Sequence, residues 1–291
     1  MQRLLFVLVK SLVWLVSKLP FTLLYGFSTL TYILVFYIIG YRKKVVQNNL
    51  KLAFPSYSES QIKQIRKKFY KHLCDFLFET IKTYSLSKEE AERRFVYTNL
   101  ELLNPVYQSG KSVLLWCGHY ASWEWSGIIS HQIPFKGYGV YKPMDNKRID
   151  GLVRNLRGRF GPNIVSNKQI VKTLFKDRKE QVQSITLMLS DQTPRPAVAK
   201  HWDKFMGVNV PVFTGGETLA NKLDLVQLYL KVEKVKRGFY TATFVPLQTE
   251  TNTNDPFPIT RSFLNELESQ IKAQPEFYLW SHRRWKYRAQ D

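Results

Sequence analysis

The sequence predicts an α/β domain in which helices flank a mixed, mostly parallel sheet, preceded by an N-terminal helical segment that anchors the chain in a membrane. Two observations indicate this fold class. Short apolar runs alternate with helical stretches from about residue 112 onward, which is typical of parallel sheets with helical crossovers. Residues 21–40 contain no charged side chain and match the roughly 20 residues that a helix needs to cross the hydrocarbon layer. With 291 residues, 44% of them hydrophobic, the chain suits one large domain with its own core.

The membrane anchor is expected over residues 1–44. It combines a span over residues 21–40 with a preceding helix that lies in the membrane interface. A polar stripe at near sevenfold spacing in an apolar segment indicates the interfacial helix: Arg3, Lys10, Ser17 and Lys18. A core helix of a soluble protein would have the same length and composition as the span, so that interpretation stays open.

The balance of charge indicates an anionic partner. The chain has 43 Lys and Arg against 23 Asp and Glu, a formal net charge of +20. Nucleic acid and an anionic leaflet both fit this charge, and the N-terminal segment favours the membrane. A basic cluster, Arg42 to Lys44, follows the span and favours the cytoplasmic side of the inner membrane for the main domain, residues 45–291. No binding to nucleic acid is expected.

Two cysteines, Cys74 and Cys117, are too few for a disulfide framework or a four-cysteine zinc site. Cys117 lies two residues before His119, which permits a Cys/His nucleophile, but a small buried hydrophobe is the simpler interpretation. His72, His131 and His201 have no spacing typical of metal ligands, and no metal or cofactor is expected.

The pattern after the anchor predicts the elements of the main domain. Ser58 and Gln61 form a capping-box pattern before a long amphipathic helix. Strands are expected in five apolar runs: 112–116, 137–141, 184–189, 225–232 and 239–245. Helices are expected between and after them: 122–130, 145–160, 168–178, 214–223 and 257–273.

The segment SVLLWCGHYASWEW runs from a predicted buried strand through a glycine turn into a helix with Ser122 at its N-cap. Ligands bind at strand ends in such sheets, so His119 in the turn and Glu124 in the first helical turn are candidate catalytic residues. If Glu124 accepts the proton on one imidazole nitrogen, the other is free to act as a general base toward a hydroxyl. A His and a Glu five positions apart are by themselves only weak evidence for a catalytic pair.

The sequence resembles the late acyltransferases of lipid A biosynthesis, the lauroyl/myristoyl transferases, within the wider glycerolipid acyltransferases. The resemblance covers nearly the whole chain and six ordered blocks: the N-terminal anchor, Phe54-Pro55, GHYASWE, YKPMDNKRIDGLVRNLRGRFG, LSDQTPR with FMGVNVPVFTGGETLA, and PEFYLWSHRRWKYR.

This resemblance implies transfer of a fatty acyl chain, usually from an acyl carrier protein thioester, to a hydroxyl of a lipid A precursor. It makes His119 and Glu124 the catalytic pair, without a cofactor. It also implies substrate-binding roles for residues of the later blocks: Lys142, Asn146, Arg157, Arg159 and Asp191. Lys142 stands where the family usually has arginine. A lysine lacks the guanidinium group that binds a phosphate through two parallel hydrogen bonds. On spacing alone, Arg157 and Arg159 fit solvated helix charges equally well, and Asp191 fits a turn cap.

Two alternatives to a lipid A acyltransferase stay open. One keeps the chemistry but takes a lysophospholipid or another monoacylated lipid as acceptor, because nothing in the sequence names the headgroup. The other is a non-enzymatic basic protein that binds membrane or nucleic acid.

A phosphate-binding loop is excluded because Pro105 occupies the position of its first glycine. The sequence contains neither the G-x-S-x-G motif of serine hydrolases nor the H-E-x-x-H motif of zinc peptidases.

Overall fold

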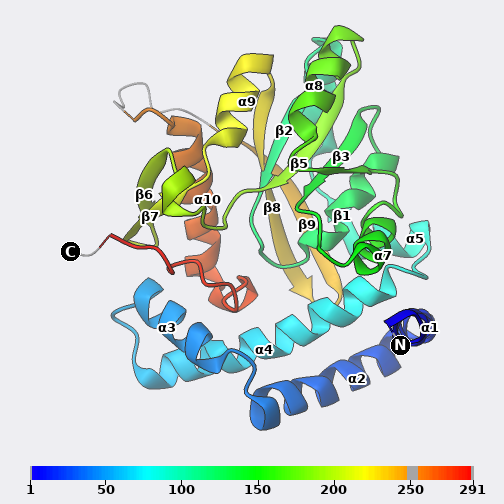
Figure 1. The fold of residues 1–291 in the computed structure, drawn as a ribbon, viewed down its shortest axis with the longest axis vertical. Helices are drawn as coiled ribbons and strands as arrows, with labels where there is room; N and C mark the ends of the chain where they lie inside the picture. The colour runs from blue at the N-terminus through cyan, green and yellow to red at the C-terminus, as the bar shows by residue number, and fades with distance from the viewer. Residues whose placement is uncertain (1, 248–254, 290–291) are drawn as a thin grey trace.

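The computed structural model describes residues 2–247 and 255–289 and is built around one large sheet (Figure 1). Seven strands form this sheet in the order β1-β9-β8-β2-β5-β3-β4. Its neighbouring strands are parallel except β8 and β9, which form an antiparallel hairpin. The predicted mixed, mostly parallel α/β fold is therefore confirmed. The strands are β1 (Phe95–Tyr97), β2 (Val113–Cys117), β3 (Lys136–Tyr141), β4 (Asn163–Ser166), β5 (Ser184–Leu189), β8 (Val226–Lys236) and β9 (Phe239–Pro246).

The five strands predicted from apolar runs are β2, β3, β5, β8 and β9. In β2 every residue is buried, as expected of a central strand with both faces covered. The main core joins residues of β2, β8 and β9 to residues of α4 and α10. A smaller core joins Tyr138 of β3 to leucines of α8 and α9. Helices therefore cover the sheet, and the ends of β2 and β5 are held in a fixed position between them (Figure 1).

The α-helices of the described residues agree in position with most of the predicted ones. Ser58 caps α4 as predicted, since its side chain accepts from the Gln61 amide and its own amide donates to Gln61 Oε1 at 2.8 Å. The helices are α1 (Gln2–Lys18), α2 (Phe21–Ile33), α3 (Lys43–Ala53), α4 (Glu59–Lys82), α5 (Lys88–Arg94), α6 (Leu103–Gln108), α7 (Lys147–Arg157), α8 (Ile170–Lys179), α9 (Gly215–Leu223) and α10 (Pro258–Ala273).

Two features differ from the sequence-based expectation. The segment after His119 is a 3-10 helix, η3 (Trp123–His131), and the Ser122 side chain does not cap it. Ala121, at φ 51°, turns the chain just before Ser122, whose φ of −110° and ψ of 62° lie outside the extended region in which an N-cap side chain reaches the helix amides. The second feature is a set of unpredicted strands: the antiparallel hairpin of β6 (His201–Phe205) and β7 (Val208–Val212), and the short edge strands β1 and β4.

The N-terminal helices lie along the edge of the molecule. α2 continues into a π-helical segment, η1 (Leu34–Ile39). Together they give one helix, Phe21–Ile39, that is long and apolar enough to cross a membrane. The length and composition thus agree with the predicted anchor. α2 packs alongside α4 instead of projecting from the domain (Figure 1).

Candidate active site

Two neighbouring strands of the sheet bring His119 and Asp191 together. β2 and β5 are parallel, and their last residues, Cys117 and Leu189, are direct partners. The residue two positions beyond each strand therefore lies at the same edge of the sheet. These residues are His119 and Asp191, at the carboxyl ends of parallel strands, where ligands bind in open α/β sheets.

The imidazole of His119 is held by the Asp191 carboxylate. His119 Nδ1 lies 2.6 Å from Asp191 Oδ1, and the His119 backbone amide donates to Asp191 Oδ2 at 3.1 Å. The Asp191 side chain is only 2% exposed and that of His119 is 14% exposed. Two bonds to one carboxylate fix both the ring and its backbone, and they favour the tautomer with its proton on Nδ1.

Asp191 stays ionised despite its burial. Burial alone would raise the pKa of Asp191, but the charge of His119, the hydrogen bonds from its ring and backbone, and the charge of Arg284 hold that pKa below its ordinary value. The carboxylate is therefore available as a permanent acceptor for the Nδ1 proton.

The second ring nitrogen is available for proton transfer. His119 Nε2 lies 3.3 Å from the side-chain amide nitrogen of Gln192. With the proton on Nδ1, Nε2 carries a lone pair that accepts from this amide. A substrate hydroxyl that takes the place of the amide would meet the same lone pair, which is the geometry that a general base requires.

The loop that carries His119 is packed tightly. A Cβ on Gly118 would lie 2.6 Å from Leu267 Cδ1, so the site leaves no room for a side chain. Ala121 adopts a left-handed φ of 51°, and the His119 carbonyl accepts from the Leu279 amide at 3.1 Å. The C-terminal segment thus holds this loop in place.

Glu124 is paired with Arg157 and not with His119. Arg157 Nε donates to Glu124 Oε2 at 2.8 Å, and Nη2 donates to Oε1 at 2.5 Å. Within the described residues, no hydrogen bond or ion pair joins Glu124 to His119. The predicted bond from His119 to Glu124 is replaced by one to Asp191, because the neighbouring strand β5 places Asp191 beside His119. The Arg157 guanidinium at the end of α7 binds both Glu124 oxygens instead. Burial alone would lower the pKa of Arg157. The hydrogen bonds to Glu124 and the charge of Glu124 outweigh this effect and raise the pKa of Arg157 above its ordinary value.

An apolar pocket opens beside this ion pair. Glu124 and Arg157 are its charged lining residues. Glycines of η3 and β3 make room for it, with aliphatic side chains of the neighbouring strands around them: Gly127, Gly137, Gly139, Leu115, Ile164, Ile185, Leu187 and Leu189. A concave apolar site with a charged pair in its lining suits a long hydrocarbon chain with a polar end.

The other predicted substrate-binding residues lie on or near α7. Lys142 is exposed in the loop after β3. Asn146 caps α7, since its Oδ1 accepts from the amides of Arg148 and Ile149 at 3.1 and 3.3 Å. Arg159 lies just beyond the helix, exposed, and donates to the Leu86 carbonyl at 2.8 Å. Of these three, Asn146 and Arg159 have structural contacts that the sequence interpretation did not include.

Cys117 does not have the features of a nucleophile. Its thiol is buried, and burial raises the pKa of Cys117 well above the ordinary value, so the sulfur stays protonated at neutral pH. The structure thus favours the buried-hydrophobe interpretation of this cysteine.

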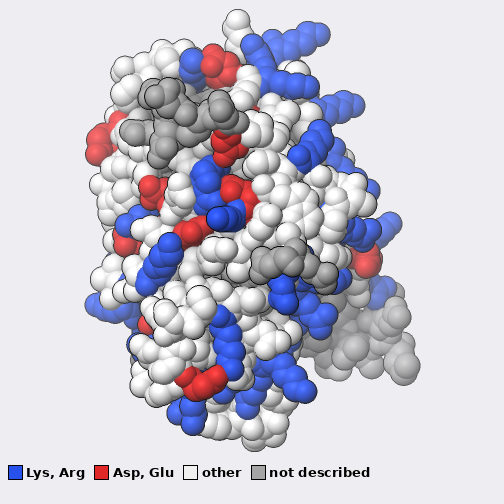
Figure 2. Space-filling model, turned by 90° about the vertical axis from the view of Figure 1, so that its left-hand side faces the viewer, with Lys and Arg blue, Asp and Glu red and all other residues white. Residues whose placement is uncertain are grey.

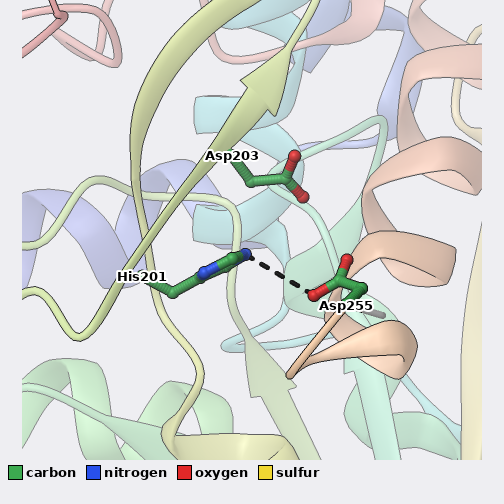
Figure 3. Close-up of side chains that lie close together, drawn as sticks. All are labelled: His201, Asp203 and Asp255. Carbon is green, nitrogen blue, oxygen red and sulfur yellow. Dashed lines mark ion pairs between the residues drawn. The ribbon is translucent and has the colours of Figure 1, made fainter. Parts of the chain in front are cut away.

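A second cluster of titratable groups lies on β6 and before α10. It consists of His201, Asp203 and Asp255, whose ligand-type atoms all lie within 4.8 Å of one another (Figure 3). His201 Nε2 is 3.7 Å from Asp255 Oδ1, and Asp203 Oδ2 is 3.1 Å from Arg261 Nη1. The positive charge of Arg261 opposes a cation here, and the contacts join the β6–β7 hairpin to α10.

Sequence reasoning missed the pairing of His119 with Asp191 and the contact with Gln192. The signal that was present is positional: SDQ directly follows the strand predicted over 184–189, as CGH directly follows the one predicted over 112–116. Only the sheet order, in which β5 is a neighbour of β2, places the two strand ends together.

Comparison with known proteins agrees with a site for acyl transfer. The chain is similar to a lipid A biosynthesis lauroyltransferase of Escherichia coli K12, with 25% identity over 280 residues, 96% of this chain and 90% of the relative. It is similar to a lipid A biosynthesis acyltransferase of Haemophilus influenzae, with 23% identity over 248 residues, 83% of this chain and 76% of the relative. It is also similar to a lipid A biosynthesis palmitoleoyltransferase of E. coli K12, with 21% identity over 286 residues, 96% of this chain and 90% of the relative. Residues 1–287 match the family of bacterial lipid A biosynthesis acyltransferases, and the chain is an acyltransferase that belongs to this family.

Proposed function

We propose that this acyltransferase moves a fatty acyl chain from an acyl thioester to a hydroxyl of a lipid A precursor, with His119 as the general base. The observation that carries the proposal is the buried Asp191 carboxylate 2.6 Å from His119 Nδ1, which leaves Nε2 as the free basic nitrogen. The similarity to a lauroyltransferase and a palmitoleoyltransferase of lipid A biosynthesis supports the reaction and the class of acceptor.

In the proposed reaction, His119 Nε2 takes the proton of the acceptor hydroxyl while its oxygen attacks the thioester carbonyl carbon. The C–O bond forms, the carbonyl electrons move to oxygen, and the C–S bond breaks as the carbonyl re-forms. The leaving thiolate takes the proton from the imidazolium. Asp191 stabilises that imidazolium without itself becoming protonated, because its pKa lies below the ordinary value. A positioned base of this kind contributes roughly 10²–10⁴ to the rate.

The apolar pocket is the proposed site of the acyl chain. Its lining is mostly apolar, and the Glu124–Arg157 pair carries no net charge, which suits a neutral thioester. We assign Glu124 and Arg157 a positioning role at this pocket. Two guanidinium hydrogen bonds hold the carboxylate in one orientation.

The remaining cations near α7 are proposed to bind phosphate groups of the substrates. Lys142 and Arg159 are both exposed on the segments that flank α7. Asn146 would act indirectly, by capping the helix that ends at Arg157.

The proposed donor is acyl carrier protein, an acidic partner for a chain of net charge +20. The proposed location is the inner membrane, with the main domain facing the cytoplasm.

The lipid profile of a deletion strain tests this function. Mass spectrometry should find lipid A that lacks one acyl chain, and wild-type protein should restore the chain, whereas His119→Ala at equal membrane abundance should not. Loss of an acyl chain from a phospholipid, with lipid A unchanged, would identify a lysophospholipid acceptor instead.

A further inference from the structure

The predicted membrane-spanning helix has one face bonded to the main domain. Ser28 Oγ donates to Asp75 Oδ1 at 2.6 Å, and Tyr25 OH donates to Glu79 Oε1 at 2.9 Å. Asp75 and Glu79 belong to α4 and are 2% and 1% exposed. Arg237, in the turn between β8 and β9, donates to Asp75 and also to the Tyr25 carbonyl at 3.2 Å. α2 is therefore part of a buried polar network.

A helix that crosses a bilayer cannot keep these contacts. Lipid would surround it, so the polar stripe of Tyr25, Ser28 and Thr29 would face hydrocarbon, or Asp75 and Glu79 would enter the membrane with it. Charged side chains in the hydrocarbon layer are costly because they lose their hydration. The network thus favours a helix that stays against α4.

The connection between α1 and α2 is also fixed by the main domain. Lys82 Nζ donates to the carbonyls of Ser17 and Leu19, each at 2.8 Å, and Ser85 Oγ donates to the Ser17 carbonyl. These bonds satisfy carbonyls at the end of α1 that a helix terminus leaves free. The chain is thereby held just before Pro20, the residue that precedes α2.

The opposite face of these helices is apolar and exposed. Leu30 is 62% and Ile38 74% exposed, and Leu12 on α1 is 60% exposed. The exposed apolar residues recur along both helices: Val7, Leu8, Val9, Leu12, Trp14 and Leu15 on α1, and Leu23, Phe27, Leu30, Ile33, Leu34, Tyr37 and Ile38 on α2 and η1. Soluble proteins rarely expose a set of this kind without a partner.

The charges around this face identify the partner. Residues 1–44 contain Arg3, Lys10, Lys18, Arg42, Lys43 and Lys44 and no acidic residue. Lys10 and Lys18 are exposed on α1, and Lys44 is exposed where α3 begins. Figure 2 shows further Lys and Arg side chains near the lower end of the molecule, where α3 lies. An apolar face on a segment that carries basic and no acidic residues is complementary to an anionic phospholipid leaflet.

We propose that α1, α2 and η1 form a seat that lies in the plane of one anionic leaflet and does not cross the bilayer. This proposal differs from the span predicted over residues 21–40. The apolar face enters the leaflet, the basic residues meet headgroups, and the polar face stays on α4. The N-terminus and the main domain then lie on the same side of the membrane.

The seat also brings the leaflet close to the candidate active site. Phe76 of α4 packs on Trp123 with ring centroids 4.0 Å apart, and Trp123 lies 5.2 Å from the His119 ring. α4 thus contacts α2 on one side and a residue next to His119 on the other. If the acceptor is a lipid, as proposed above, it can present its hydroxyl to His119 without leaving the leaflet.

Cysteine labelling of the full chain tests which side of the membrane each part occupies. One variant carries an N-terminal tag with one cysteine, and the other carries Ser109→Cys, an exposed position in the main domain. Wild-type protein is the background control, because Cys74 and Cys117 are buried. A membrane-impermeant maleimide is added to intact spheroplasts and to lysed ones. The seat predicts that both variants are labelled in the same preparation; labelling from opposite sides would overturn it.

Vesicle binding tests the face itself. Leu30→Glu with Ile38→Glu should weaken binding to phosphatidylglycerol and phosphatidylethanolamine vesicles by at least about tenfold. The matched control is Val198→Glu, a 69% exposed apolar residue outside these helices, which should bind as wild type does. Unchanged binding of the double variant would refute the seat. Neither measurement depends on acyl transfer, so a failure of the proposed reaction would leave both results interpretable.

Discussion

Asp191 Oδ1 lies 2.6 Å from His119 Nδ1, although the two residues are 72 positions apart in the chain. Replacing Asp191 with asparagine removes the charge that stabilises the imidazolium and lets the side-chain amide favour the wrong tautomer. We expect Asp191→Asn to lower kcat by about 10²–10⁴ while leaving the KM for the acyl donor within a few-fold. Steady-state acyl transfer from a lauroyl thioester measures both quantities.

Glu124→Gln is the matched comparison, because it also neutralises one carboxylate of the site. It alters the contact with Arg157 and leaves the His119–Asp191 bond in place. The loss in kcat should therefore be smaller than for Asp191→Asn. A larger loss for Glu124→Gln would show that Glu124, and not Asp191, is the carboxylate that supports the base.

Glu124 and Arg157 should be energetically coupled. Two hydrogen bonds join them, and their side chains are 12% and 31% exposed. A double-mutant cycle of Glu124→Ala and Arg157→Ala should give a coupling of about 0.5–3 kcal/mol in the free energy of unfolding. Denaturant unfolding of the four proteins measures it, and additive effects would contradict the pairing.

Gly139 should influence the length of the transferred chain. A Cβ there would lie 3.1 Å from Ile164 Cδ1, and both residues line the apolar pocket. Gly139→Val should reduce the space in this pocket and shift the products toward shorter acyl chains when mixed thioesters are supplied. The control is Gly151→Val on α7, where a Cβ would meet no atom within 4 Å. The same product distribution in both variants and wild type would place the acyl chain elsewhere.

Glu79 should make the stability of the fold depend on pH. Burial raises the pKa of Glu79 to about 7, against the opposing effects of Lys234 and of hydrogen bonds from Tyr240 and Tyr25. Because the folded-state pKa is above the ordinary value of 4.5, the contribution to stability is complete below that value and is lost as the pH rises through about 7. The melting temperature of the wild type should therefore fall over this range.

Glu79→Gln should flatten this dependence, since the glutamine does not ionise. The difference between the two proteins should be on the order of a few kcal/mol at alkaline pH. Glu59→Gln, at a side chain that is 70% exposed, is the control and should behave as the wild type does. A melting temperature of the wild type that stays constant from acid to alkaline pH would contradict the assignment.

The strands that position the site were predictable because each contains a mainly apolar run. β2, β3, β5, β8 and β9 all lie within the sheet, where burial demands such runs. β1 and β4 were missed because they are short and at the sheet edges. The β6–β7 hairpin turns at Met206 and Gly207, with φ of 50° and 79°, and methionine is not a residue that predicts a left-handed turn.

The candidate base was predictable and its partner was not. His119 follows a buried strand and a glycine, which is a local signal. Asp191 was flagged only as a substrate-binding residue, because its contact with His119 depends on β5 lying next to β2. Glu124 is close to His119 in sequence, but its carboxylate is bound by Arg157, which follows 33 positions later. Side-chain pairing across the sheet is set by tertiary structure, which local spacing does not encode.

The most direct measurement of the central claim is acyl transfer by purified protein to a lipid A precursor, followed by mass spectrometry of the lipid. Wild-type protein should add one acyl chain from an acyl carrier protein thioester. His119→Ala, with unchanged melting temperature and vesicle binding, should add none above background. Acyl transfer by His119→Ala at the wild-type rate would contradict the assignment of His119 as the general base.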